Sequence, residues 1–208
     1  MTIGNMIFHK YKLIFICVAK NASASVFENL QNQTDREFAH KTIFEVFGEN
    51  DPELATSYYA FATSRNPYDR FYSAYMWLNV NNRDYNDSVI DPDDIQSDFE
   101  NYVDAVYKNR DAFFSDPHHL PQYRYVSFRG KLLVDEVLAF ETLEQDWIAF
   151  AEKYNLTSQF KLKLNLEPRN VSMSRKRDWR EAYTLEMKKK VYDIYWKDFE
   201  LFGYESEL

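Results

Sequence analysis

The stretch that decides the fold is Leu13-Ile14-Phe15-Ile16-Cys17-Val18-Ala19-Lys20-Asn21-Ala22-Ser23-Ala24-Ser25-Val26. Seven apolar residues end at a lysine, and a short loop of small and hydroxyl-bearing residues leads into a helical pattern that begins at about Ser23. A buried strand that feeds a tight turn and a helix N-terminus presents backbone N–H groups to an anion. Lys20 adds a full positive charge, so the stretch predicts an anion-binding loop.

This loop differs from the Walker A loop that binds ATP. It contains no glycine and lacks the Gly-Lys-Ser/Thr ending that contacts phosphates and Mg²⁺ in that motif. The alternative is a buried strand followed by an ordinary polar turn, because small polar residues often follow strands. The stretch alone leaves both interpretations open.

A second segment has the same layout. Tyr58 to Thr63 is a short apolar run, and Asn66 and Pro67 are typical of an N-cap and a first helical position. Arg65 therefore stands at the end of a predicted strand, directly before a predicted helix, and its guanidinium can bind a phosphate through two hydrogen bonds. Alternatively, Arg65 forms a salt bridge with an acidic residue of the protein.

Residues 65–75 read Arg-x-Pro-x-x-Arg-x-x-Ser-x-Tyr, a pattern that resembles the 3′-phosphate-binding motif of sulfotransferases. Ala19 to Ser25 resembles their 5′-phosphosulfate-binding loop. Later segments resemble further motifs of the carbohydrate (Golgi-type) sulfotransferase family and its bacterial relatives: His118 to Gln122, Val134 to Asp146 and Val191 to Tyr204. The segments occur in the family's order and span most of residues 12–204, so the chain is identified as a member of that family.

The resemblance implies a fold and a donor. The expected fold is α/β, of the P-loop-like sulfotransferase type. The expected co-substrate is 3′-phosphoadenosine-5′-phosphosulfate (PAPS), the expected product is 3′-phosphoadenosine-5′-phosphate (PAP), and no metal ion is expected. The implied donor-binding residues are Lys20, Asn21, Ala22, Ser23, Ala24 and Ser25 at the 5′ end, and Arg65 and Ser73 at the 3′ end.

Two further features of the sequence concern the predicted donor site: a basic run and a departure from the family pattern. Arg175 and Lys176 are candidates for a lid over the nucleotide, although a solvated charged run is the alternative. The loop has Ala19 and Ala22 where the family more often has proline and glycine. Ala22 lacks the conformational freedom of glycine, which bears on the geometry of the sulfate site.

Sulfuryl transfer needs a base that removes the proton from the acceptor hydroxyl. Histidine is the first choice because its ordinary pKa lies near neutrality. His118 corresponds to the histidine of the family's His-x-x-Pro-Gln segment, and we favour it over His119. Alternatively, the pair caps a loop or shapes the acceptor cleft. Glu141 is a rival base, or a structural partner of Lys20 or Arg65.

Apolar runs and helical periodicity alternate along the chain. Strands are expected at residues 12–19, 58–63 and 134–140, with a shorter one at 42–47, and helices at 23–33, 67–79, 94–109, 142–155 and 184–199. This alternation is typical of a mostly parallel sheet flanked by helices. Ligands of such sheets bind beyond the carboxyl ends of the strands. A chain of 208 residues with no evident linker is expected to form a single domain over residues 1–208.

The composition of the chain indicates which partners and which locations are expected. The formal net charge is −8, which argues against nucleic acid, because that binding depends on a basic face. No run approaches the roughly 20 apolar residues of a membrane span, so no transmembrane segment is expected. Cys17 is expected to be a core residue. The glycosylation sequon Asn21-Ala22-Ser23 lies inside the proposed sulfate loop, where a glycan would block the site, and this favours a cytoplasmic location. The alternative is a domain excised from a luminal protein.

The leading hypothesis is a PAPS-dependent sulfotransferase that acts on the hydroxyl of a small molecule or glycan, with a carbohydrate favoured. A P-loop-type kinase is one alternative, against which the missing Gly-Lys-Ser/Thr ending counts. A non-catalytic nucleotide-binding protein of the same fold is another, because the loop lacks the glycine of the family pattern.

Overall fold

The computed structural model describes residues 7–31, 40–48, 53–80, 98–156 and 178–208. The chain forms two compact units, Met1–Arg65 with Gln122–Glu167 and Asn66–Pro121 with Pro168–Leu208, which we call unit 1 and unit 2. The chain passes between them after Arg65, after Pro121 and after Glu167, so neither unit is a continuous stretch of sequence. The single-domain organisation of residues 1–208 stays a prediction.

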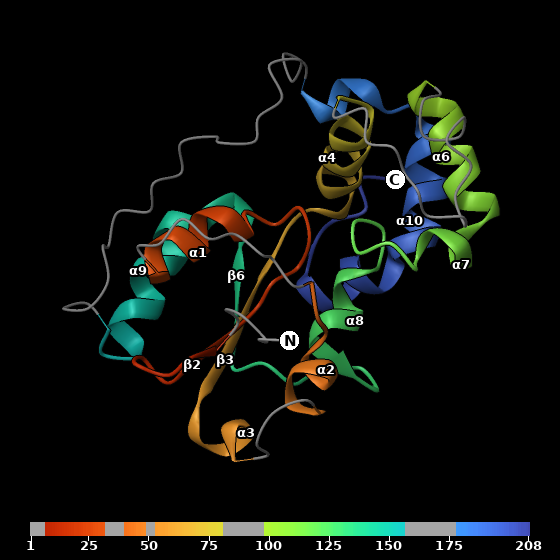
Figure 1. Cartoon of the computed structure of the whole chain (residues 1–208). Helices are drawn as coiled ribbons and strands as arrows, with labels where there is room; N and C mark the ends of the chain where they lie inside the picture. The colour runs from red at the N-terminus through yellow and green to blue at the C-terminus, as the bar shows by residue number, and fades with distance from the viewer. Residues whose placement is uncertain (1–6, 32–39, 49–52, 81–97, 157–177) are drawn as a thin grey trace. The chain divides into compact units, whose positions relative to one another are not determined.

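Unit 1 is built on a four-stranded sheet in the order β1-β2-β3-β6 (Figure 1). The strands are β1 (Ile7–Phe8), β2 (Leu13–Ile16), β3 (Tyr59–Ser64) and β6 (Glu136–Ala139). β2, β3 and β6 run parallel, and β1 is an antiparallel edge strand. The mostly parallel sheet flanked by helices is confirmed, and β2, β3 and β6 overlap the strands predicted at 12–19, 58–63 and 134–140.

Helices α1 (Ser23–Gln31) and α9 (Leu143–Lys153) pack against this sheet, in agreement with the helices predicted at 23–33 and 142–155. Phe15 of β2 and Phe61 of β3 are paired, with ring centroids 5.0 Å apart. Phe61 also contacts Phe150 of α9 at 4.7 Å. Every residue of β2 is buried, as in parallel strands that are covered on both faces.

The strand predicted at residues 42–47 is wrong, because this segment forms helix α2 (Ile43–Gly48). The Glu45 amide donates to Thr42 Oγ1 at 3.3 Å, and the Thr42 amide donates to the Glu45 carboxylate at 2.6 Å. This reciprocal pair is a capping box, which satisfies amides at the start of a helix. Ile43 and Val46 are the buried residues, and their spacing is helical.

Unit 1 also contains short elements that the sequence did not predict. They are α3 (Leu54–Ser57), α8 (Gln122–Val126), the 3₁₀ turn η1 (Phe140–Thr142) and a hairpin of β4 (Ser127–Phe128) and β5 (Lys131–Leu132). The hairpin turns at Arg129 and Gly130, whose φ angles are 49° and 77°. Positive φ at both central residues is typical of the type I′ turn, which matches the twist of paired antiparallel strands.

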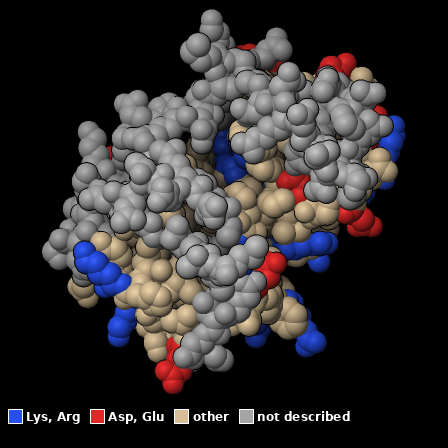
Figure 2. All heavy atoms as spheres, in the orientation of Figure 1, with Lys and Arg blue, Asp and Glu red and all other residues tan. Residues whose placement is uncertain are grey.

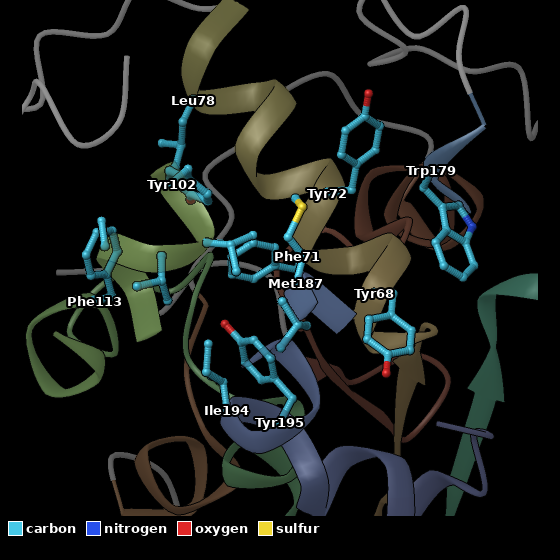
Figure 3. Packing of buried hydrophobic residues seen from close by; sticks show 14 of the residues in the cluster. Tyr68, Phe71, Tyr72, Leu78, Tyr102, Phe113, Trp179, Met187, Ile194 and Tyr195 are labelled. Atoms are coloured by element: carbon cyan, nitrogen blue, oxygen red, sulfur yellow. The ribbon is translucent and has the colours of Figure 1, made fainter. Parts of the chain in front are cut away.

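Unit 2 consists of helices around an aromatic core (Figure 3). Its elements are α4 (Pro67–Val80), α6 (Phe99–Lys108), α7 (Arg110–Phe113), the 3₁₀ turn η2 (Trp179–Ala182) and α10 (Leu185–Phe202). The ring of Phe71 on α4 lies 5.4 Å from Tyr102 of α6 and 6.0 Å from Tyr195 of α10. One buried ring therefore joins three helices, and buried aromatic residues stabilise such contacts.

Capping residues explain where the helices of unit 2 begin. The Asp98 side chain accepts from the Asn101 amide at 2.9 Å at the start of α6, and Thr184 accepts from the Met187 amide at 3.2 Å at the start of α10. The helices predicted at 67–79, 94–109 and 184–199 correspond to α4, α6 and α10, and residues 94–97 lie outside the described residues.

On the face shown in Figure 2, the blue lysines and arginines are interspersed with red acidic residues. Across the described ranges, none of the helices combines the length and the hydrophobicity that a membrane crossing needs.

Candidate functional site

The parallel strands of unit 1 end together at one edge of the sheet. Ile16 at the end of β2 pairs with Ala62, and Ser64 at the end of β3 pairs with Ala139 at the end of β6. The loop of residues 17–22, Arg65 and the turn η1 follow these three ends. Parallel sheets bind ligands at this carboxyl edge, so the fold places the predicted anion-binding loop and the predicted arginine where a ligand site is expected.

The loop that leads into α1 has a distinctive backbone. Lys20 and Ala22 have φ angles of 69° and 57°, in the left-handed region that costs a residue with a side chain about 1–2 kcal/mol. When successive residues alternate between right-handed and left-handed backbone conformations, their N–H groups point into one concavity that can bind an anion. Ser23 then begins α1, whose first amides have no acceptor within the helix. We call residues 19–25 the Lys20 loop.

The side chain of Asn21 fixes the Lys20 loop from inside. It is fully buried, and its Nδ2 donates to the backbone oxygen of Thr63 at 2.7 Å and to Oε1 of Gln122 at 2.6 Å. In return, Thr63 Oγ1 donates to the backbone oxygen of Asn21 at 2.7 Å. The side chain of Asn21, a predicted donor-binding residue, is thus engaged within the protein, and its place in the loop is set by β3.

Gln122 and Arg65 extend this network. Gln122 Oε1 accepts from the Arg65 amide at 3.0 Å, and its Nε2 donates to the Arg65 carbonyl at 2.9 Å. Arg65 Nη1 donates to the backbone oxygen of Lys20 at 2.8 Å, and its guanidinium stacks on the Phe140 ring, with Cζ 4.1 Å from the ring centre. Gln122 belongs to a recognised motif, but its role could not be predicted from the sequence, because its partners Asn21 and Arg65 are distant in the chain.

The strained backbone at Ala22 leads to a stability prediction. Glycine adopts positive φ without steric cost but gives the unfolded chain more freedom, at about 0.5–1 kcal/mol. We therefore expect Ala22→Gly to leave the free energy of unfolding unchanged or to raise it by up to about 1 kcal/mol. The matched control is Ala149→Gly on the exposed side of α9. This change should lower the free energy of unfolding by about 1 kcal/mol. Urea unfolding measures the free energy of unfolding of both variants. An equal decrease in the two variants would contradict the strain at Ala22.

Unit 2 places His118 beside a buried carboxylate. His118 Nδ1 lies 2.8 Å from Asp116 Oδ1, and the His118 amide donates to the same oxygen at 2.8 Å. Because an ionised carboxylate only accepts, Nδ1 of the neutral imidazole bears the hydrogen and Nε2 bears the lone pair. The imidazole stacks on Trp77 of α4, with ring centroids 4.2 Å apart. The ring is therefore oriented by a third group, as a general base requires.

His119 belongs to the aromatic core of unit 2. Its side chain is fully buried, its Nε2 hydrogen-bonds with the hydroxyl of Tyr102, and the Phe113 ring lies 5.0 Å away. Its Nδ1 is 3.4 Å from Asp116 Oδ2. A histidine enclosed in this way can order the loop around it, but an acceptor hydroxyl cannot reach it.

Arg70, the second arginine of the 65–75 segment, supports residues 116–120, which we call the histidine loop. It is buried on α4, and its Nη2 donates to the carbonyl of Leu120 at 2.9 Å and more weakly to that of Pro117 at 3.4 Å. These carbonyls flank His118 and His119 in the sequence. The sequence indicates no role for Arg70, since neither spacing nor charge reveals its contacts with these carbonyls.

Asp116 is the charged residue that organises this loop. Burial alone would raise the pKa of Asp116, but the hydrogen bond from the His118 side chain and the nearby His119 side chain hold this pKa below its ordinary value. No feature of the sequence other than its place two residues before His118 marked Asp116 as a partner.

The lowered pKa of Asp116 predicts how stability depends on pH. A carboxyl with a lower pKa in the folded state stabilises the fold above its unfolded pKa of about 3.9, and this contribution is lost as pH falls through the folded value. Asp116→Asn should therefore lower the free energy of unfolding by about 1–2 kcal/mol at pH 7, because charged hydrogen bonds become neutral ones.

The two unfolding curves should converge as the pH falls below about 4, where the unfolded carboxyl is protonated. Urea unfolding of wild type and Asp116→Asn between neutral and acid pH measures this. Asp111→Asn on the exposed surface of α7 is the control. A difference between wild type and Asp116→Asn that stays constant with pH contradicts the lowered pKa.

The other predicted residues are distributed as follows. Ala24 and Ser25 lie in the first turn of α1 in unit 1, and Glu141 is exposed in η1. Ser73 is half-buried on α4 and belongs, like His118 and His119, to unit 2. Arg175 and Lys176 lie outside the described residues. Cys17 is buried, and burial raises the pKa of its thiol to about 12, as expected of a core residue.

Comparison with known proteins adds one match. A family model described as the sulfotransferase family matches residues 5–205. No curated protein and no solved structure matches the chain. The matched range includes the Lys20 loop, the 65–75 segment and the histidine loop. The chain therefore belongs to the sulfotransferase family.

Proposed function

We propose that this protein transfers a sulfuryl group from PAPS to a hydroxyl group, with a carbohydrate as the favoured acceptor. The observation that carries the proposal is the Lys20 loop at the carboxyl edge of the sheet, which combines a lysine, two left-handed residues and the start of α1. Each of these features favours bound negative charge. Membership of the sulfotransferase family supports a phosphosulfate as the bound anion.

The residues of the Lys20 loop suit the 5′ end of this donor. PAPS supplies an activated sulfuryl group whose bridging oxygen gains negative charge during transfer. Lys20 would stabilise that charge by a charge-assisted hydrogen bond, and the amides of Ala22, Ser23 and Ala24 with the Ser25 hydroxyl would bind the phosphate. The Ser23 hydroxyl donates to the Val18 carbonyl at 2.9 Å, so we assign only its amide to the donor.

The 3′ end of the donor would be bound by residues from the other recognised motifs. Arg65 and Ser73 are the proposed ligands of the 3′-phosphate. Arg175 and Lys176 remain proposed as a basic lid over the nucleotide. A phosphate dianion favours such groups because arginine and lysine supply charge-assisted hydrogen bonds.

His118 is the base that we propose. Asp116 directs Nδ1, so that the lone pair on Nε2 accepts the proton of the acceptor hydroxyl, and the carboxylate then stabilises the imidazolium. We prefer His118 to His119 because the side chain of His119 is fully buried. Glu141, exposed in η1, is the second choice.

The proposed acceptor rests on the family resemblance, and the proposed location rests on the sequon. A carbohydrate hydroxyl is favoured by the resemblance to carbohydrate sulfotransferases. We propose a cytoplasmic location because Asn21, the asparagine of the sequon, is fully buried and donates to Thr63 and Gln122. A glycan on this nitrogen would break both hydrogen bonds.

A transfer assay with radiolabelled PAPS tests the proposal against a panel of oligosaccharides, small alcohols and phenols. We expect label on a carbohydrate, and we expect PAP to raise the melting temperature because it binds only the folded state. Stabilisation by ATP with Mg²⁺ but not by PAP would favour the kinase alternative. Binding of PAP without transfer to any acceptor would favour a non-catalytic nucleotide-binding protein.

A further inference from the structure

The guanidinium of Arg65 contacts the Lys20 loop directly. Arg65 is 4% exposed, and its Nη1 donates to the backbone oxygen of Lys20 at 2.8 Å. The guanidinium also stacks on the Phe140 ring, with Cζ 4.1 Å from the ring centre. A charged donor makes a stronger hydrogen bond to a carbonyl than a neutral one. The ring limits the movement of the planar guanidinium, so the arginine is fixed against the loop.

This hydrogen bond acts on the strained part of the loop. Lys20 has a φ angle of 69°, and a left-handed residue with a side chain persists only where its surroundings hold it. The carbonyl that Arg65 binds belongs to the peptide that joins Lys20 to Asn21. Holding this peptide sets the direction of the Lys20 side chain and of the amides that follow.

The backbone of Arg65 is held by the same network. Gln122 bonds both the amide and the carbonyl of Arg65, at 3.0 and 2.9 Å. The same Gln122 oxygen accepts from the Asn21 side chain at 2.6 Å. All three residues are buried. The end of β3 and the Lys20 loop are thus joined by neutral hydrogen bonds and by the charged hydrogen bond from the Arg65 guanidinium.

We infer that Arg65 is a positioning residue for the Lys20 loop, in addition to its proposed contact with the 3′-phosphate. This inference rests on the proposed function, because it assigns the 5′ end of the donor to that loop. A residue that contacts only the 3′-phosphate does not change the affinity for a nucleotide that lacks this phosphate. A residue that holds the Lys20 loop affects every nucleotide whose 5′-phosphate the loop binds.

Two nucleotides that differ by a single phosphate separate these roles. PAP carries the 3′-phosphate, and adenosine 5′-monophosphate lacks it. Isothermal titration calorimetry on folded Arg65→Ala, well below its melting temperature, should show a loss of affinity for adenosine 5′-monophosphate of about tenfold, the value of one charged hydrogen bond. The loss for PAP should be at least as large. Arg124→Ala, which removes an exposed arginine from α8, should change neither affinity.

A double variant tests whether Arg65 acts through the loop. If it does, Lys20→Ala combined with Arg65→Ala should lose less affinity for adenosine 5′-monophosphate than the product of the two single losses. A merely structural role for Arg65 would lower the melting temperature but leave the affinity of the folded protein unchanged. If Arg65→Ala does not fold, Arg65→Lys keeps the charge without the planar fork, and adenosine 5′-monophosphate should lose affinity, with a loss for PAP that is at least as large.

Unchanged affinity of Arg65→Ala for adenosine 5′-monophosphate, with a loss confined to PAP, overturns the inference and leaves the proposed function intact. A folded wild-type protein that binds neither nucleotide overturns the proposed function itself.

Discussion

Replacing Lys20 with alanine is expected to lower kcat for sulfuryl transfer by about 10³-fold, because one preorganised donor at a developing charge contributes on this scale. The fold should tolerate the change, since the φ angle of 69° at this position is as costly for lysine as for alanine. Affinity for PAP should also fall, since Lys20 would bind the 5′-phosphate of product and donor alike.

The matched control for this prediction is Lys12→Ala. Lys12 is exposed, also has a positive φ angle, at 52°, and stands before the opposite end of β2. The same truncation on the same backbone conformation should therefore leave kcat and PAP affinity unchanged. The rate of label transfer from PAPS measures kcat of both variants. More than a tenth of wild-type kcat in Lys20→Ala would remove this lysine from the proposed chemistry.

Replacing His118 with alanine is expected to lower kcat by about 10²–10⁴-fold, the usual contribution of a general base. The affinity for PAP should be retained, because the proposed role of His118 is toward the acceptor hydroxyl. The acid limb of the pH–rate profile, which reports protonation of the base, should disappear from the residual activity.

Two further variants make the His118 result specific. Asp116→Asn keeps the side-chain shape but permits the other imidazole tautomer, so it should also lower kcat while leaving KM for PAPS unchanged. His9→Ala removes an exposed histidine whose Nδ1 pairs with the Tyr58 hydroxyl at 2.9 Å, and it should leave kcat unchanged. Full activity in His118→Ala would move the base elsewhere, with Glu141→Gln as the next variant to measure.

The sequence predicted the sheet because its strands are apolar runs that end in polar turns. β2 and β3 needed no information beyond their own residues. The segment at 42–47 was misassigned because five residues from Ile43 to Phe47 fit a strand as well as a helix, and the Thr42-x-x-Glu45 capping pair was overlooked. The hairpin at Arg129 and Gly130 was missed because each of its strands has only two residues.

The sequence indicates candidate site residues where charge and chain order carry the information. Lys20, Arg65 and His118 come from local motifs. The partners that orient them do not, because Gln122 is 101 residues from Asn21 along the chain and is joined to it only by folding. His119 and His118 are neighbours with the same chemistry, and only their burial distinguishes a core residue from a proposed base.

The placement of β6 has a consequence for biosynthesis. β3 lies between β2 and β6, but Glu136–Ala139 leaves the ribosome long after Tyr59–Ser64. At translation rates of about 5–20 residues per second, one edge of β3 stays unpaired for roughly 4–15 seconds. An apolar strand with an unpaired edge is prone to aggregate with nascent neighbours. The yield of folded protein should therefore depend on chaperones that shield this edge during translation, and slower elongation after residue 64 should lower that yield.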